Sequence, residues 1–92
     1  MDNRDVSKVL TLIADLLEAH GENRFKIRAY RNVAQSVDTL DGDINALRKE
    51  GKLRSIPGVG KAIEEKITEY LTTGRLVYID DLKKNAPSEF EL

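Results

Sequence analysis

The sequence predicts an all-α domain, and the spacing of its apolar residues carries most of that prediction. Apolar residues recur at helical intervals in several segments, and the first of these stripes contains Val6, Val9, Leu10, Ile13, Leu16 and Leu17. Glycine follows such stripes at residues 21, 51 and 74, where it supplies a helix stop. No segment alternates between apolar and polar residues for more than a few positions, as a half-buried strand would.

These patterns predict four main helices and a short C-terminal one. We expect them at about residues 5–19, 24–37, 44–50, 61–73 and 76–82. Asn23 and Asp43 are placed to cap the second and third helices with their side-chain oxygens. We expect one domain over residues 1–86 and interpret residues 87–92 as a linker to a following domain.

Composition excludes several classes of site. The chain has no cysteine, so it can form neither a disulfide nor a Cys-based zinc site, and we expect a reducing compartment. His20 is the only histidine, which excludes a His-rich metal centre. No apolar run approaches the ~18 residues of a membrane span, so we expect a cytoplasmic chain with no membrane partner.

The net charge of −1 hides an uneven distribution of charged residues. Residues 24–66 carry ten basic and six acidic side chains, a net charge of +4. Residues 1–23 carry a net charge of −3, and residues 67–92 carry −2. A basic middle between acidic ends indicates a face that meets an anionic partner.

The stretch IPGVGKAIEEKI, residues 56–67, invites comparison with a phosphate-binding P-loop. A P-loop needs a glycine five residues before Gly60 and a Ser or Thr directly after the lysine. Those positions hold Ser55 and Ala62, and no strand precedes the loop. A nucleoside triphosphate cradle is therefore not expected here.

We interpret this stretch as a helix-hairpin-helix motif. Gly58 and Gly60 occupy positions where a side chain would block a positive φ or a close approach, and Val59 between them is expected to point inward. Backbone amides at the start of the following helix, with Lys61 beside them, would bind phosphate independently of nucleotide sequence. The alternative is a plain turn between two helices that binds nothing.

Lys66 falls at the edge of the apolar stripe of the fourth helix. Its stem would lie on apolar surface, and both partial desolvation and neighbouring cations would favour the neutral amine. A neutral amine is what imine formation with an aldehyde requires, so Lys66 is a candidate nucleophile. The alternative is a lysine whose stem covers the border of the core and whose charge stays in water.

A second basic cluster occupies NRFKIRAYR, residues 23–31. Lys26 lies in the first turn of the second helix, beside backbone amides that could dock a second phosphate. Arg28 and Arg31 project from the non-core side of that helix, and Phe25 is placed either to stack on a base or to pack as a staple against the helix. Tyr30 lies on the apolar stripe and is expected in the core.

Three motifs together resemble a known family: ADLLEAHGENRFKIRAYRNVA (14–34), GKLRSIPGVGKAIEEKI (51–67) and the tail TGRLVYIDDLKKNAPSEFEL. Over nearly its whole length the chain is similar to the N-terminal 8-kDa-type domain of family X DNA polymerases, the DNA polymerase beta relatives. The similarity is greatest to their bacterial and archaeal branch. It implies a four-helix domain that grips the 5′-phosphate on the downstream side of a gap in DNA.

The resemblance also implies roles for individual residues. Lys66 matches the lysine that attacks the C1′ aldehyde of a 5′-deoxyribose phosphate in members with lyase activity. Lys26 matches a 5′-phosphate lysine, and Tyr30 matches its supporting tyrosine. The chain departs from the beta-type pattern at Ala62, where that pattern has a phosphate-pocket lysine, and at Phe25, where it has a stacking histidine.

The family further implies a monovalent cation, Na⁺ or K⁺, held at the hairpin by the backbone carbonyls of Arg54, Ile56 and Val59. No other cofactor is expected for this domain, and Mg²⁺ would serve only a polymerase domain that this chain does not contain. The predicted function is therefore binding of gapped or nicked DNA in base excision repair, as a nucleoid-associated monomer, with 5′-deoxyribose-phosphate lyase activity through Lys66. The alternative is a non-catalytic module that positions DNA or a protein partner.

Overall fold

A computed structural model describes residues 1–84 of the chain. Its elements are α1 (Asn3–Ala19), α2 (Arg24–Asp38), α3 (Ile44–Lys49), the 3₁₀ turn η1 (Leu53–Ser55), α4 (Lys61–Thr73) and α5 (Val77–Lys84). None of the described residues forms a strand, so the predicted all-α fold with four main helices and a short C-terminal one is confirmed. The predicted domain end at residue 86 and the linker 87–92 lie outside the described residues.

Side chains next to the helix ends explain where the helices begin. The Asp2 carboxylate accepts the Asp5 amide at 2.9 Å, and the Asp5 carboxylate accepts the Asp2 amide at 3.0 Å, which closes a capping box before α1. Asn23 and Asp43 cap α2 and α3, as predicted. In contrast, α4 begins after Gly60, which offers its first-turn amides no side-chain cap.

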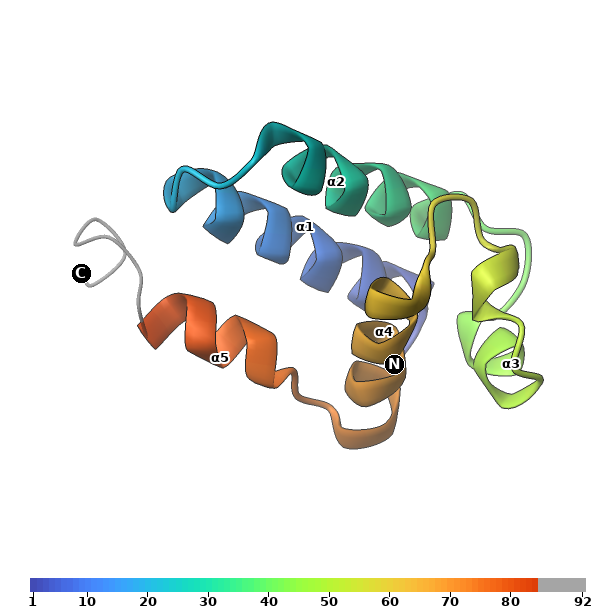
Figure 1. Ribbon diagram of the computed structural model, residues 1–92. Helices are drawn as coiled ribbons and strands as arrows, with labels where there is room; N and C mark the ends of the chain where they lie inside the picture. Colours follow the sequence, from blue (N-terminus) through green and yellow to red (C-terminus); the bar gives the residue numbers. More distant parts are fainter. Residues whose placement is uncertain (85–92) are drawn as a thin grey trace.

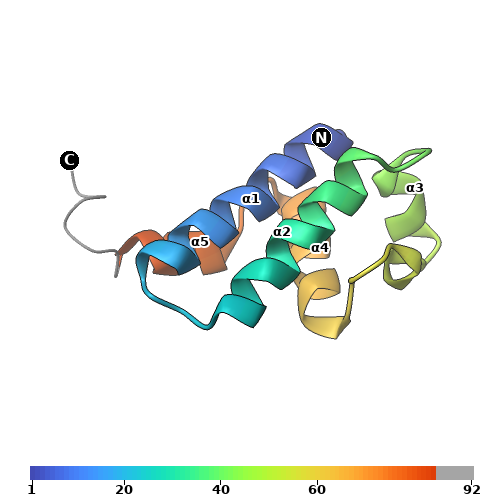
Figure 2. The same cartoon turned by 90° about the horizontal axis from the view of Figure 1, so that it is seen from above.

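The helices pack around one apolar core. Figures 1 and 2 show α1 and α2 running side by side in opposite directions, with α5 on the other side of α1. All four main helices, η1 and α5 contribute buried side chains, and among the described residues no polar or charged residue is buried. At the end of α5, the Leu82 carbonyl lies 2.9 Å from Nε2 of His20, which ties this helix to the end of α1. No described helix has the length and apolar character needed to cross a membrane.

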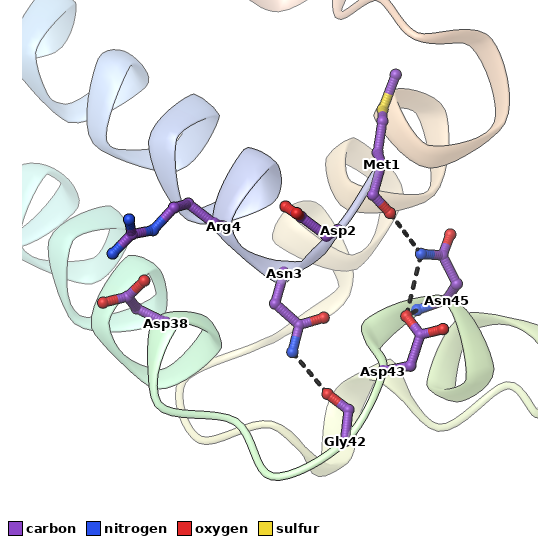
Figure 3. A pocket seen from close by; sticks show the side chains of 8 residues that line it. All are labelled: Met1, Asp2, Asn3, Arg4, Asp38, Gly42, Asp43 and Asn45. Atoms are coloured by element: carbon purple, nitrogen blue, oxygen red, sulfur yellow. Dashed lines mark hydrogen bonds between the residues drawn. The ribbon is translucent and has the colours of Figure 1, made fainter.

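Polar contacts join the N-terminus to α3. The Asn3 side chain donates to the Gly42 carbonyl at 2.6 Å and accepts the Ile44 amide at 2.9 Å, and Asn45 donates to the Met1 carbonyl at 2.7 Å. An open pocket of about 560 Å³ lies at this junction, and Figure 3 shows the bonds from Asn3 to Gly42 and from Asn45 to Met1 at its wall. None of the predicted site residues lines it. We therefore interpret this pocket as a structural junction.

Candidate nucleic-acid interface

The hairpin that joins η1 to α4 is a tight turn over Ile56, Pro57, Gly58 and Val59. The Val59 amide donates to the Ile56 carbonyl at 3.1 Å, and Gly58 has φ +89°. Proline in the second position and a positive φ in the third are typical of a type II turn, which favours glycine there. The motif thus folds as predicted because its proline and its first glycine have the backbone conformations that this turn needs.

The hairpin is anchored to the core by its apolar residues. Ile56 is 2% exposed and Val59 is 7% exposed, so Val59 points inward as predicted. A Cβ at Gly58 would lie 3.0 Å from the Cγ2 atom of Val33 on α2, so the turn also approaches α2 closely. Two separate features therefore require glycine at position 58: its positive φ and its close approach to Val33.

Gly60 differs from Gly58. Its φ of −102° is open to any residue, and no atom lies within 4 Å of the place where its Cβ would be. Nothing inside the described structure requires a glycine at this position. The empty space lies at the uncapped start of α4, beside the exposed side chain of Lys61. An anion can approach these amides and the positive end of the helix dipole without steric hindrance.

The start of α2 differs from what the sequence indicated. The Asn23 side chain accepts the Phe25 amide at 2.7 Å, and the Asn23 carbonyl accepts the amides of Lys26 and Ile27, each at 3.1 Å. The prediction that free backbone amides beside Lys26 dock a phosphate is therefore wrong for Phe25, Lys26 and Ile27, because their amides already donate hydrogen bonds to Asn23. The Lys26 amine itself is available, although it lies 3.3 Å from the Glu22 carboxylate.

The other predicted residues of α2 separate into exposed and paired side chains. Phe25 is 72% exposed, so the alternative in which it packs as a staple is wrong. Arg28 is also exposed. Arg31 is not free, because its guanidinium lies 3.0 Å from the Asp15 carboxylate and 2.7 Å from the Glu18 carboxylate on α1.

Lys26 and Lys66 meet at a residue that sequence reasoning did not select, Tyr78 of α5. The Lys66 Nζ atom lies 4.5 Å from the centroid of the Tyr78 ring, and the Lys26 Nζ atom lies 5.9 Å from the same centroid. The Tyr78 ring also stacks on the ring of Tyr30, with 6.4 Å between the centroids and an interplanar angle of 22°. Residues from α2, α4 and α5 thus form one cluster, which we call the two-lysine cluster: Lys26, Tyr30, Lys66 and Tyr78.

Burial within the two-lysine cluster agrees with the helical patterns. Tyr30 is 4% exposed and belongs to the core, as predicted, and Lys66 is half-buried at the border of the core. In the sequence, the one feature that could have identified Tyr78 as a site residue was its position beside Ile79 on the last amphipathic segment. That signal places an aromatic ring near the core, but it does not reveal which lysines the ring meets.

Electrostatics distinguish the members of this cluster. A hydrogen bond to the Tyr78 side chain is the largest influence that raises the pKa of Lys26, with Glu22 adding to it against partial burial. Lys26 is therefore a cation at neutral pH. Burial, with a smaller contribution from Tyr78, raises the pKa of the Tyr30 phenol to about 12. The cluster is thus positively charged and lined by neutral aromatic rings.

Two of the three backbone carbonyls predicted to bind a monovalent cation, those of Arg54 and Val59, have oxygen lone pairs left free by the hydrogen bonds of the hairpin. In a 3₁₀ turn the Arg54 carbonyl would accept the amide three residues on, but Pro57 has none. Within the described residues, no backbone amide outside the helices donates to the carbonyls of Arg54 or Val59, whereas the Ile56 carbonyl accepts one. Carbonyl oxygens with free lone pairs are suitable ligands for hard cations.

Comparison with known proteins adds independent information on this chain. A family model described as a helix-hairpin-helix domain matches residues 1–76. The DNA polymerase/3′-5′ exonuclease PolX of Bacillus subtilis (strain 168) is 31% identical over 87 residues, which cover 95% of this chain and 15% of that protein. DNA polymerase lambda of Arabidopsis thaliana is 26% identical over 74 residues, which cover 80% of this chain and 13% of that protein. The chain therefore spans a small fraction of the length of these relatives.

Proposed function

The chain belongs to the helix-hairpin-helix family, as the DNA-binding domain type found at the N-terminus of family X DNA polymerases, and from that premise we propose that it binds gapped DNA through the downstream 5′-phosphate. The observation that carries this proposal is that the amines of Lys26 and Lys66, from two different helices, both lie over the ring of Tyr78. Two ammonium groups from different helices attract a terminal phosphate, which carries more charge than a phosphate within a strand.

The hairpin would hold a second phosphate of the same DNA. Its uncapped amides at the start of α4, the open space at Gly60 and the exposed Lys61 support this role. Such contacts position the DNA backbone without reading its sequence. We propose that a monovalent cation on the carbonyls of Arg54, Ile56 and Val59 supplies further positive charge there. Exposed Phe25 and Arg28 would contact the DNA beside the gap.

We also propose that Lys66 gives the domain 5′-deoxyribose-phosphate lyase activity. Its neutral amine would attack the C1′ aldehyde, so that a C–N bond forms and water leaves to give an imine. Loss of the C2′ proton to a base then breaks the C3′–O bond and releases the downstream DNA with its 5′-phosphate. Hydrolysis of the imine returns the amine. The half-buried position of Lys66 beside the proposed phosphate site supports this role.

Binding is tested with gapped DNA that carries or lacks the downstream 5′-phosphate. We expect wild type to prefer the phosphorylated gap, and Lys26→Ala and Lys66→Ala each to reduce that preference. Lys49→Ala is the matched control, because Lys49 is an exposed lysine of α3. Equal affinity of wild type for the two gaps would contradict the phosphate proposal.

The lyase step is tested by borohydride reduction in the presence of DNA with a 5′-deoxyribose phosphate. Wild type should form a covalent adduct, and Lys66→Arg should form none, because guanidinium retains the charge but does not form the imine. A Lys66→Arg variant that still prefers the phosphorylated gap would separate chemistry from binding. If wild type gives no adduct, the second candidate function holds: a module that positions DNA without acting on it.

A further inference from the structure

Lys66 is held by an aromatic ring. Its Nζ atom lies 4.5 Å from the Tyr78 centroid, well within the ~6 Å over which a ring attracts a cation. Among the described residues, none forms an ion pair with Lys66, whereas Lys26 has Glu22 at 3.3 Å. The Tyr78 ring is thus the main group that orders the Lys66 amine.

The ring itself is held by the core. Tyr78 stacks on Tyr30, which is 4% exposed, and its neighbour on α5, Ile79, is 8% exposed. The α5 helix is tied at one end to α4, because the Val77 amide donates to the Glu69 carboxylate at 2.8 Å. These contacts set both the register of α5 and the plane of the ring.

We propose that Tyr78 is a positioning residue that orders the Lys66 and Lys26 amines without itself adding a negative charge. This inference rests on the proposed function, for which the two amines form the phosphate site. A carboxylate in the place of Tyr78 would also order the amines, but it would neutralise them and compete with phosphate. A neutral ring attracts a cation through its quadrupole and leaves the full charge for the ligand. The lysines are then ordered before DNA arrives, which lowers the entropy lost on binding.

Both lysines lie over the ring of the same side chain. The Nζ atom of Lys66 lies closer to the ring centroid than the Nζ atom of Lys26. Tyr78→Phe keeps the ring and should therefore keep both amines in place. Tyr78→Leu should release both amines while an apolar side chain still covers Tyr30.

The position of Lys66 is measured without DNA, by NMR of its side chain. A lysine over an aromatic face has ε-methylene protons shifted upfield by the ring current. We expect this shift for Lys66 in wild type and in Tyr78→Phe, and its loss in Tyr78→Leu. Tyr70→Leu is the control, because Tyr70 carries another aromatic ring one helical turn after Lys66 on α4, and the shift should persist in this variant. An unshifted Lys66 in wild type would overturn the proposal without any variant.

The consequence for function is measured as the ratio of affinities for the gap with and without a 5′-phosphate. Tyr78→Leu should lower this ratio by about two- to fivefold, the equivalent of about 0.5–1 kcal/mol for an ordered cation–ring contact. Tyr78→Phe should keep most of the wild-type ratio, because it retains the ring. A ratio unchanged in Tyr78→Leu would overturn the positioning role. A wild type with no phosphate preference would instead contradict the proposed function. The NMR shift would then still show whether Tyr78 holds Lys66 over its ring.

Discussion

Tyr30 illustrates how a single residue couples the core to the site. Tyr30 is 4% exposed and its ring stacks on Tyr78, and burial raises the pKa of its phenol to about 12 from an ordinary value of 10.0. A raised pKa in the folded state means that folding favours the protonated phenol. The stability that comes from this preference is fully present below pH 10 and is lost as pH rises through about 12. Lys26, whose pKa is also raised, contributes in the same direction.

We therefore predict that one tyrosine of this chain ionises near pH 12 and that alkali destabilises the fold between about pH 10 and 12. Tyrosinate absorbance measures the first effect, and the free energy of unfolding at several pH values measures the second. Tyr30→Phe should remove the late-titrating group and should reduce the alkaline loss of stability, which is about 2–3 kcal/mol for a shift of this size. A Tyr30→Phe variant with an unchanged alkaline profile would contradict this assignment.

At the scale of the element, the two hairpin glycines have different roles. Gly58 has φ +89° and would place a Cβ 3.0 Å from Val33, so the folded protein requires glycine there. Gly60 has φ −102° and open space around it, so neither backbone strain nor a close neighbour requires glycine there. The sequence motif does not distinguish the two glycines. Their backbone conformations and surroundings in the folded chain do.

We predict that alanine acts mainly on stability at Gly58 and mainly on DNA binding at Gly60. Gly58→Ala should lower the free energy of unfolding by about 1–3 kcal/mol, because a left-handed φ and a close contact both oppose the new Cβ. Gly60→Ala should cost at most about 1 kcal/mol, since alanine caps a helix less well than glycine. It should nevertheless weaken DNA binding several-fold, because its methyl group narrows the approach to the α4 amides. Chemical denaturation and binding to gapped DNA measure the two effects.

The helix ends show what local sequence can predict. Asn23, Asp43 and Gly74 mark the ends of α2, α3 and α4 where the structure has them, because caps and stops depend on neighbouring residues alone. Helix α1 begins at Asn3, earlier than the predicted residue 5, because Asp2 and Asp5 cap each other. The 3₁₀ turn η1 was missed because three residues carry too little periodicity to recognise.

The site was less predictable than the helices because it depends on tertiary packing. Lys26 and Lys66 were identified by helical position and resemblance, but Tyr78 lies on a helix whose register is set by contacts with α1 and α4. No local pattern states that a ring from the last helix will lie under lysines from two others. The long-range part of the site therefore required the structure.

At the scale of the whole molecule, the fold changes the charge distribution that the sequence suggests. The acidic first segment does not stay apart from the basic middle, because Asp15 and Glu18 bind Arg31 and Glu22 pairs with Lys26. Counting charges along the chain therefore overestimates the basic face. These pairs are exposed, so each contributes little to stability, but they reduce the charge available to DNA.

The salt dependence of DNA binding measures how many cations remain available. If Lys26, Lys61 and Lys66 neutralise one phosphate each, the logarithm of the association constant should fall with the logarithm of salt concentration with a slope of about −2 to −3. Lys61→Ala should reduce this slope by about one, because one counterion fewer is released. Lys49→Ala, on the exposed side of α3, should leave it unchanged. A slope near zero would mean that the folded charge distribution does not direct binding. An equal reduction of the slope in Lys61→Ala and Lys49→Ala would mean the same, because only a phosphate contact made by Lys61 itself can release counterions that Lys49 does not.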